Sequence, residues 1–162
     1  MSLTQHRSGW VIAFSFIIAL ILTMLPLPGD IEIFRPEWVT LTLIYWCMAL
    51  PARVGVGIGF TTGLFLDVIR DTLLGQYALA LTLIAFITLH LHQRVRVFPL
   101  WQQAVSIFIL IMLESVVVLW VKGIIGESVS FWKLLATAGT SMIAWPIVYM
   151  VLRHVRRTYQ VS

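Results

Sequence analysis

The sequence predicts an all-α integral membrane protein with six transmembrane helices in a single domain, residues 1–162. Two observations support this fold class. The chain is 60 % hydrophobic and only 11 % charged, whereas about a quarter of the residues in a soluble domain are charged. Its long apolar runs are separated by short gaps, and acidic residues occur in every second gap only. A chain of this composition needs lipid around it, because so much apolar surface would otherwise aggregate in water.

Six apolar runs are expected to form the helices, most of them close to the ~20 residues that span ~30 Å of hydrocarbon. They cover residues 9–27, 37–51, 53–71, 73–92, 98–121 and 131–152. The first run follows His6 and Arg7, but it is too long for a typical signal peptide. The second run is short and lies between Pro36, which suits a first helical turn, and Pro51, which ends it.

The charges between the runs predict the orientation. One set of gaps, with both chain ends, contains seven arginines and no carboxylate: Arg7, Arg53, Arg94, Arg96, Arg153, Arg156 and Arg157. The other set contains carboxylates together with Arg35, Arg70, Lys122 and Lys133. Because short loops rich in Arg and Lys stay in the cytoplasm, both termini are expected there. Four tryptophans near the ends of the runs fit the lipid–water interface: Trp10, Trp38, Trp101 and Trp132.

The third run has the strongest internal pattern. Small and acidic residues recur at intervals of four, with Gly57 beside them: Gly55, Gly59, Gly63, Asp67 and Asp71. Residues four apart share one helix face, and a glycine face lets another helix approach closely in lipid. Two interpretations remain open. The face packs against a helix of the same bundle, or it forms a groove for a partner's helix or a lipid tail.

Two carboxylates are expected within the bilayer. Asp67 lies roughly 21 Å along the third run and Glu114 about 24 Å along the fifth, so a similar depth is expected for both. Carboxylates at such depth are costly unless paired, which makes them functional candidates. Asp67 either pairs with Arg70 or takes part in binding. Glu114 either shares a polar pocket with Asp67 or pairs with a basic residue such as Arg35 or Lys122.

The sequence argues against most other chemistries. The scattered arginines form no basic stripe with interleaved aromatics, so nucleic-acid binding is not expected. His90 and His92 are two positions apart on a helix and face different directions, which disfavours a shared metal ion. No serine has the neighbours of a hydrolase nucleophile, and no phosphate loop or dinucleotide motif occurs. We therefore expect no enzymatic activity, no cofactor and no metal.

The gap before the second run is the most distinctive loop, with Arg35, Pro36, Glu37 and Trp38 in succession. The proline supplies a rigid turn, the arginine a bidentate donor and the tryptophan an interfacial aromatic. This group either starts the second helix and anchors it at the headgroups, or it holds a periplasmic or lipid partner.

Short motifs occur in order along the chain: Phe34-Arg35-Pro36 with Trp38, Tyr45-Trp46, Ala49-Leu50-Pro51, Arg53-Val54-Gly55, Gly59-Phe60 to Gly63 with Asp67, Leu74-Gly75, Trp101-Gln102-Gln103-Ala104 and Trp145-Pro146. Together they resemble the MreD family of bacterial rod shape-determining membrane proteins, most closely its proteobacterial members. The resemblance covers nearly the whole chain. The positions that it marks are Arg35, Pro36, Trp38, Gly59, Gly63 and Asp67.

The resemblance implies a non-enzymatic subunit of the elongasome, the machinery of sidewall peptidoglycan synthesis, in the bacterial inner membrane. It also implies a fold similar to the substrate-binding membrane subunits of energy-coupling-factor vitamin transporters. The implied partners are the transmembrane helix of MreC and, more broadly, MreB, RodZ, RodA and a class-B penicillin-binding protein, with membrane lipids around them.

Two functions follow as expectations. The first is a scaffold that docks the MreC helix on the glycine face of the third run and so positions cell-wall synthases. The alternative is a membrane subunit that binds or transports a small solute or a lipid intermediate. In that case Asp67, Glu114 and Arg35 would line a pocket that is open outward.

Overall fold

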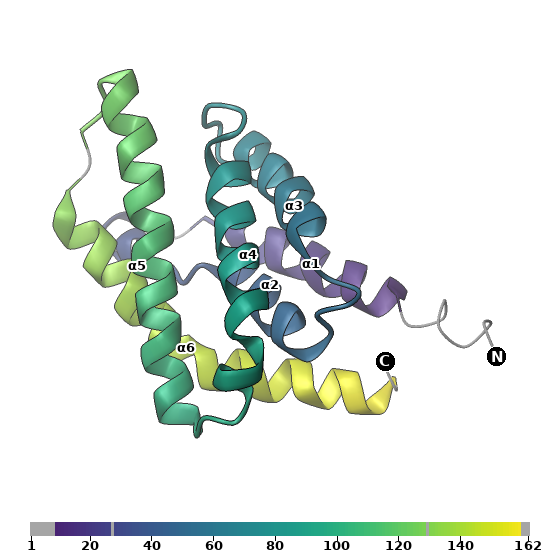
Figure 1. The fold of residues 1–162 in the computed structure, drawn as a ribbon. Coiled ribbons are helices and arrows are strands. Elements are labelled where there is room, and N and C mark those ends of the chain that lie inside the picture. The colour runs from purple at the N-terminus through teal and green to yellow at the C-terminus, as the bar shows by residue number, and fades with distance from the viewer. Residues whose placement is uncertain (1–8, 27, 129, 160–162) are drawn as a thin grey trace.

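The computed structural model describes residues 9–26, 28–128 and 130–159, and these ranges form a helical bundle (Figure 1). Its elements are α1 (Gly9–Met24), the short 3-10 helix η1 (Gly29–Phe34), α2 (Trp38–Ala49), α3 (Val56–Ile69), α4 (Gln76–Arg96), α5 (Leu100–Ile125) and α6 (Phe131–Thr158). Arg7, one of the arginines behind the predicted orientation, lies outside the described residues.

Each of the six apolar runs forms a helix in the structure, with shifted boundaries. The three helices in the second half of the chain extend beyond their predicted ends, to Arg96, Ile125 and Thr158, because Arg and other long side chains continue a helix readily. α5 stops at Gly126, which has a φ of 93° and therefore adopts the left-handed conformation common just after a helix. The gap before α2, predicted as a loop, contains about two turns of 3-10 helix in η1.

The helices differ in their capacity to cross a bilayer. By length and composition, α4, α5 and α6 can each cross a membrane. The other three are apolar but shorter, with 16, 12 and 14 residues in α1, α2 and α3. At 1.5 Å per residue, α2 covers about 18 Å of the ~30 Å hydrocarbon layer. The chain is thus a multi-pass membrane protein, while the arrangement with six crossings stays a prediction.

The core of the bundle is built around α2. All residues from Val39 to Ala49 are buried, and α2 packs against α1, α4 and α6 (Figure 1). A helix that is apolar on every side is stable only when protein or lipid surrounds it. Here the neighbouring helices surround it, and Trp46 is completely enclosed. This central position explains how a helix too short to span a bilayer is retained in the fold.

Polar side chains tie the outer helices together. The Trp46 indole N–H donates to the Ser15 hydroxyl at 2.9 Å and joins α2 to α1. The Trp145 indole N–H donates to the Gln103 side-chain oxygen at 3.3 Å, and the Gln103 amide donates to the Val95 carbonyl at 3.1 Å. These two bonds connect α6, α5 and the last turn of α4. In an apolar environment such bonds satisfy groups that have no water to bind.

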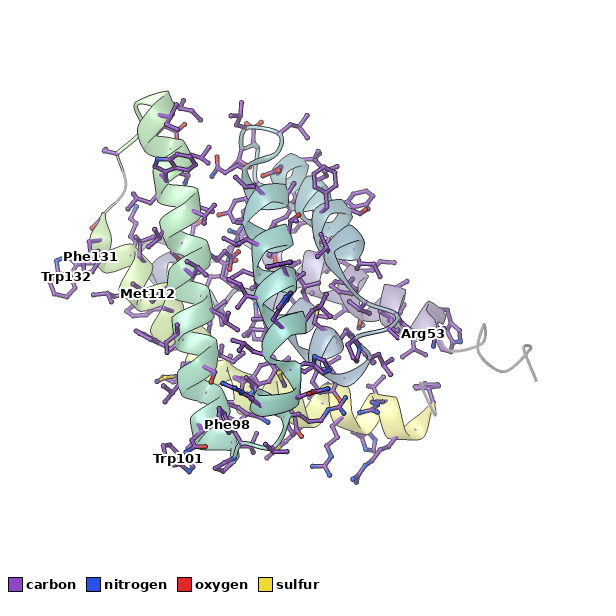
Figure 2. All side chains as sticks on the ribbon, in the orientation of Figure 1. Arg53, Phe98, Trp101, Met112, Phe131 and Trp132 are labelled. Atoms are coloured by element: carbon purple, nitrogen blue, oxygen red, sulfur yellow. The ribbon has the colours of Figure 1, made fainter. Side chains whose placement is uncertain are left out.

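Aromatic side chains stand out from the bundle near several helix ends. Figure 2 shows Phe131 and Trp132 projecting from the start of α6, and Trp101 projecting near the start of α5. Trp132 is 76 % exposed and Trp101 is 66 % exposed, and Trp10 is exposed as well. Such positions suit the membrane interface. Trp38 differs, because it packs against the core.

Candidate functional site

The glycine face of α3 is covered by α4. A Cβ atom on Gly63 would lie 2.6 Å from the backbone nitrogen of Ala78, and one on Gly59 would lie 3.0 Å from the carbonyl oxygen of Leu81. The two helices therefore touch backbone to backbone (Figure 1). Gly55 is less crowded, with the Leu89 side chain 3.6 Å from its would-be Cβ. Of the two interpretations of this face, the structure selects packing within the bundle and rules out an open groove there.

Asp67 caps the start of α4. Its carboxylate accepts hydrogen bonds from the backbone N–H groups of Gly75 (2.9 Å), Tyr77 (2.8 Å) and Ala78 (3.3 Å), and from the Thr72 hydroxyl (2.9 Å). The first N–H groups of a helix have no partners within the helix, so an acceptor there satisfies them. A negatively charged acceptor is also stabilised by the positive end of the helix dipole. Asp67 is fully buried. Its carboxylate thus connects the end of α3 to the start of α4.

The predicted pair between Asp67 and Arg70 is wrong. Arg70 instead forms a salt bridge with Glu37 at the start of α2, with Nη2 to Oε2 at 3.0 Å and Nη1 to Oε1 at 3.3 Å. The same guanidinium donates to the Tyr77 hydroxyl at 2.6 Å. Asp67 is unavailable to it because its oxygens already accept the α4 backbone donors. The Glu37–Arg70–Tyr77 network joins α2, α3 and α4 at one end of the bundle.

The loop with Arg35 and Pro36 connects α1 to α2. Arg35 donates to the backbone carbonyls of Thr23 at 2.7 Å and Leu25 at 2.6 Å. A cation at these carbonyls satisfies groups that the end of α1 leaves without helical partners and is favoured by the helix dipole. Arg35 has the extended backbone typical of a residue before proline. Trp38 follows as the first residue of α2, so the group mainly sets the angle between the two helices.

Glu114 is the most unusual polar group in the bundle. It is 2 % exposed, and its Oε1 accepts a hydrogen bond from the Thr40 hydroxyl at 2.9 Å. Its Oε2 is buried and has no hydrogen-bond partner among the described residues. The partner is thus Thr40 of α2, and neither Arg35 nor Lys122 pairs with this carboxylate. A buried, half-satisfied carboxylate is costly and is retained mainly where it has a function.

Glu114 faces a cavity of about 1030 Å³ at the N-terminal end of α2. We call this space the outer cavity, after the side of the membrane on which the loop charges predict that it lies. Its charged lining residues come from η1, the α2 start, the α3 end, α5 and α6: Glu32, Arg35, Glu37, Arg70, Glu114, Lys122 and Lys133. Asp67 is not among the lining residues, so the shared pocket for Asp67 and Glu114 is wrong, whereas Arg35 and Glu114 do line one space.

The outer cavity is lined by groups that can hold a polar ligand. Glu114 supplies an acceptor at a buried position, while Lys122 and Lys133 supply cations between α5 and α6. Within the described part of the chain, no three His, Cys, Asp or Glu side chains come together as a metal site. The chemistry of the lining residues is that of binding by charge and hydrogen bonds.

Comparison with known proteins identifies the family. The sequence model of the family described as "rod shape-determining protein MreD" matches residues 5–155. The chain belongs to the MreD family. The Rod shape-determining protein MreD of Haemophilus influenzae is 29 % identical over 155 residues, which cover 95 % of this chain and 96 % of that protein. No solved structure matches the chain, so the predicted likeness to the subunits of energy-coupling-factor transporters stays a prediction.

Several residues of the site in this MreD-family chain were not predicted from sequence. Thr40 and Tyr77 are the main examples, since each completes a network with a charged residue from another helix. A hydroxyl within an apolar run is the only sequence signal for either of them. That signal is weak, because Thr and Tyr hydroxyls in helices commonly bond to their own helix or reach the interface.

Proposed function

We propose that the chain is a non-enzymatic scaffold of the elongasome that docks the transmembrane helix of MreC and supports sidewall peptidoglycan synthesis and rod cell shape. Membership of the MreD family supports the role in shape. The protein would lie in the bacterial inner membrane with both termini in the cytoplasm, as the alternating charges of its loops predict. The same assembly would contain four further partners, directly or indirectly bound: MreB, RodZ, RodA and a class-B penicillin-binding protein.

The docking surface that we propose is the face of α3 opposite Gly59 and Gly63. Because those two glycines pack against α4, the original face has no room for a partner. Gly57 and Thr61 lie on the opposite face and are exposed, and a Cβ on Gly57 would meet no atom within 4 Å. Small residues four apart let two helices approach closely in lipid, where packing drives association. This open small-residue face is the observation that supports docking.

A bulky residue on this face provides the test. We expect Gly57→Leu to lower the recovery of co-expressed, affinity-tagged MreC about tenfold, because overpacking a tight contact costs roughly 1–3 kcal/mol. The melting temperature of the variant should match that of the wild type, since the added side chain meets only lipid.

Gly139→Leu on α6 is the matched control, because Gly139 also has no atom within 4 Å of a would-be Cβ. It should leave the recovery of MreC unchanged. Normal recovery with Gly57→Leu, or a loss with Gly139→Leu alone, would rule out docking on α3.

A second candidate function is favoured by one specific observation, the unpartnered Glu114 oxygen in the outer cavity. In this case the protein binds or transports a small solute or a lipid intermediate, with Arg35 and Glu114 among the lining residues. A cavity of about 1030 Å³ is at the upper end of the range for natural ligand sites, roughly 300–1,000 Å³. Asp67 has no part in this version, since its oxygens are engaged in the α4 cap.

Glu114→Gln tests the second function. The glutamine keeps an acceptor for Thr40 and cannot ionise, so the cost of burying an ionisable carboxyl group is removed. We therefore expect the protein to become more stable by about 1 kcal/mol, or a few degrees in melting temperature. Any small molecule or lipid held by this carboxylate should be lost. Native mass spectrometry of protein extracted gently from membranes reports that loss.

The control is Glu127→Gln, which removes an exposed charge between α5 and α6. It should change the stability by less than about 0.5 kcal/mol and leave any bound molecule in place. A lower melting temperature for Glu114→Gln, with bound molecules unchanged, would show that this carboxylate is structural.

A further inference from the structure

A second cavity, of about 400 Å³, lies at the C-terminal end of α2, whereas the outer cavity lies at its N-terminal end. We call it the arginine cavity because four arginines line it: Arg96, Arg153, Arg156 and Arg157. Arg96 is the last residue of α4, and the other three belong to the last two turns of α6. Figure 1 shows this half of α6, coloured yellow, running below α2 and crossing the lower end of α4.

Among the described residues, the partners of these arginines carry no formal charge. Arg96 donates to the backbone carbonyls of Met48 at 2.7 Å and Ala49 at 3.1 Å, at the end of α2. The Arg153 guanidinium lies 6.0 Å from the centre of the Tyr149 ring. Carbonyls and rings orient a guanidinium, but they leave its positive charge uncompensated.

Within residues 9–26, 28–128 and 130–159, no residue that lines the arginine cavity is acidic. Among the described residues, the salt bridge between Arg70 and Glu37 is the only one, and it lies at the other end of α2. Four like charges around one small space repel each other, and their summed field attracts an anion. The arrangement is therefore most stable when an anion occupies the cavity.

The geometry favours phosphate. Guanidinium groups bind phosphate oxygens in bidentate pairs, which a simple anion such as chloride cannot match. The side chains of Tyr45 and Tyr149 line the same cavity and add neutral hydroxyl groups. A volume of about 400 Å³ is within the range of natural ligand sites and accommodates a headgroup with one or two phosphates.

The position of the cavity along α6 points to a lipid rather than a free ion. Ile147, Met150 and Val151 are all at least 55 % exposed and lie on one face at spacings of three and four. Arg153 and Arg157 follow on the adjoining face within the next two turns. An acyl chain along the apolar residues would therefore bring its headgroup to the arginines, as at other basic pockets between membrane helices.

We propose that the arginine cavity binds the phosphate of an anionic phospholipid whose acyl chains lie along the exposed apolar face of α6. The site is separate from the proposed docking face on α3 and from the outer cavity. It would hold α2, α4 and α6 together at the end of the bundle that contains most of the arginines.

The test compares lipid binding by the full chain and its variants in detergent. The probes are phosphatidylglycerol and cardiolipin, with phosphatidylcholine and inorganic phosphate as the comparison arms, and binding is read by native mass spectrometry. We expect Arg153→Gln to weaken binding of the anionic lipids about fivefold and Arg153→Gln with Arg157→Gln about 25-fold, since each basic residue near a lipid surface contributes roughly a factor of five.

Arg94→Gln is the matched control, because Arg94 is exposed at the same end of α4 and does not line the cavity. It should change binding less than about twofold. A melting temperature without lipid shows that each variant is folded, and added cardiolipin should raise it in the wild type and in Arg94→Gln only.

Three results would overturn the proposal. An equal loss of lipid binding in Arg94→Gln would mean that diffuse surface charge binds the lipid. Equal affinity for phosphatidylcholine, which has a phosphate but no net charge, would mean that the cavity does not select anionic lipids. Equal stabilisation by inorganic phosphate would mean that the site takes a free ion.

Discussion

Asp67→Ala is expected to unfold the hairpin of α3 and α4. The substitution leaves the buried N–H groups of Tyr77 and Ala78 and the partly buried N–H of Gly75 without an acceptor, and each buried unsatisfied group costs about 1–3 kcal/mol. The total loss of roughly 3–5 kcal/mol is among the largest for a point substitution. In a domain of this size it corresponds to a fall in melting temperature on the order of 10 °C, measured by thermal unfolding in detergent.

The matched pair is Asp67→Asn and Asp71→Asn. Asp71 lies four residues on, is exposed and has a φ of 53°, which asparagine tolerates. Asp71→Asn should therefore melt like the wild type. Asp67→Asn should melt well below it, because the amide places donors against the N–H groups of α4. If Asp67→Asn is as stable as the wild type and loses only a bound ligand, Asp67 is a binding group and the cap is incidental.

The second large effect is expected at Gly63. In Gly63→Ala the new Cβ meets the backbone of Tyr77 and Ala78, and backbone atoms cannot rotate away as a side chain does. Overpacking of this kind costs about 1–3 kcal/mol, which exceeds the gain of roughly 1 kcal/mol in helix propensity from glycine to alanine. We expect a lower melting temperature and faster proteolysis between α3 and α4.

Gly57→Ala is the control on the same helix, and its Cβ enters open space. It should be as stable as the wild type or slightly more so. If Gly63→Ala is equally stable, the close contact between α3 and α4 is absent in the membrane. A loss of MreC from Gly63 variants alone would report damage to this hairpin and would say nothing about the docking face.

Local sequence features predicted the helices well. Hydrophobicity, the gaps between apolar runs and the helix-breaking residues act within a few turns of chain, so all six helices appear close to their expected places. The predicted helix lengths were too short in the second half of the chain, where helices continue into basic segments. The short motifs also identified the family, since their order and spacing depend on sequence alone.

The sequence did not predict which helices pack against each other. The spacing of four placed Gly59, Gly63 and Asp67 on one face, but it did not show that α4 occupies that face. It likewise could not show that Arg70 pairs with Glu37, 33 residues away, or that Thr40 reaches Glu114. A periodic pattern specifies which residues share a side of one helix. It does not specify which neighbouring helix packs against that side.

By itself the sequence determined that this is a helical, multi-pass membrane protein of the MreD family, because apolar length and charge placement are properties of each segment. Only the tertiary structure decided that Asp67 is a helix cap, that the glycine face is filled, and that Glu114 and four arginines face cavities at opposite ends of α2. These outcomes depend on which surfaces meet in space, where one buried acceptor or one missing Cβ selects among helices that are all similarly apolar.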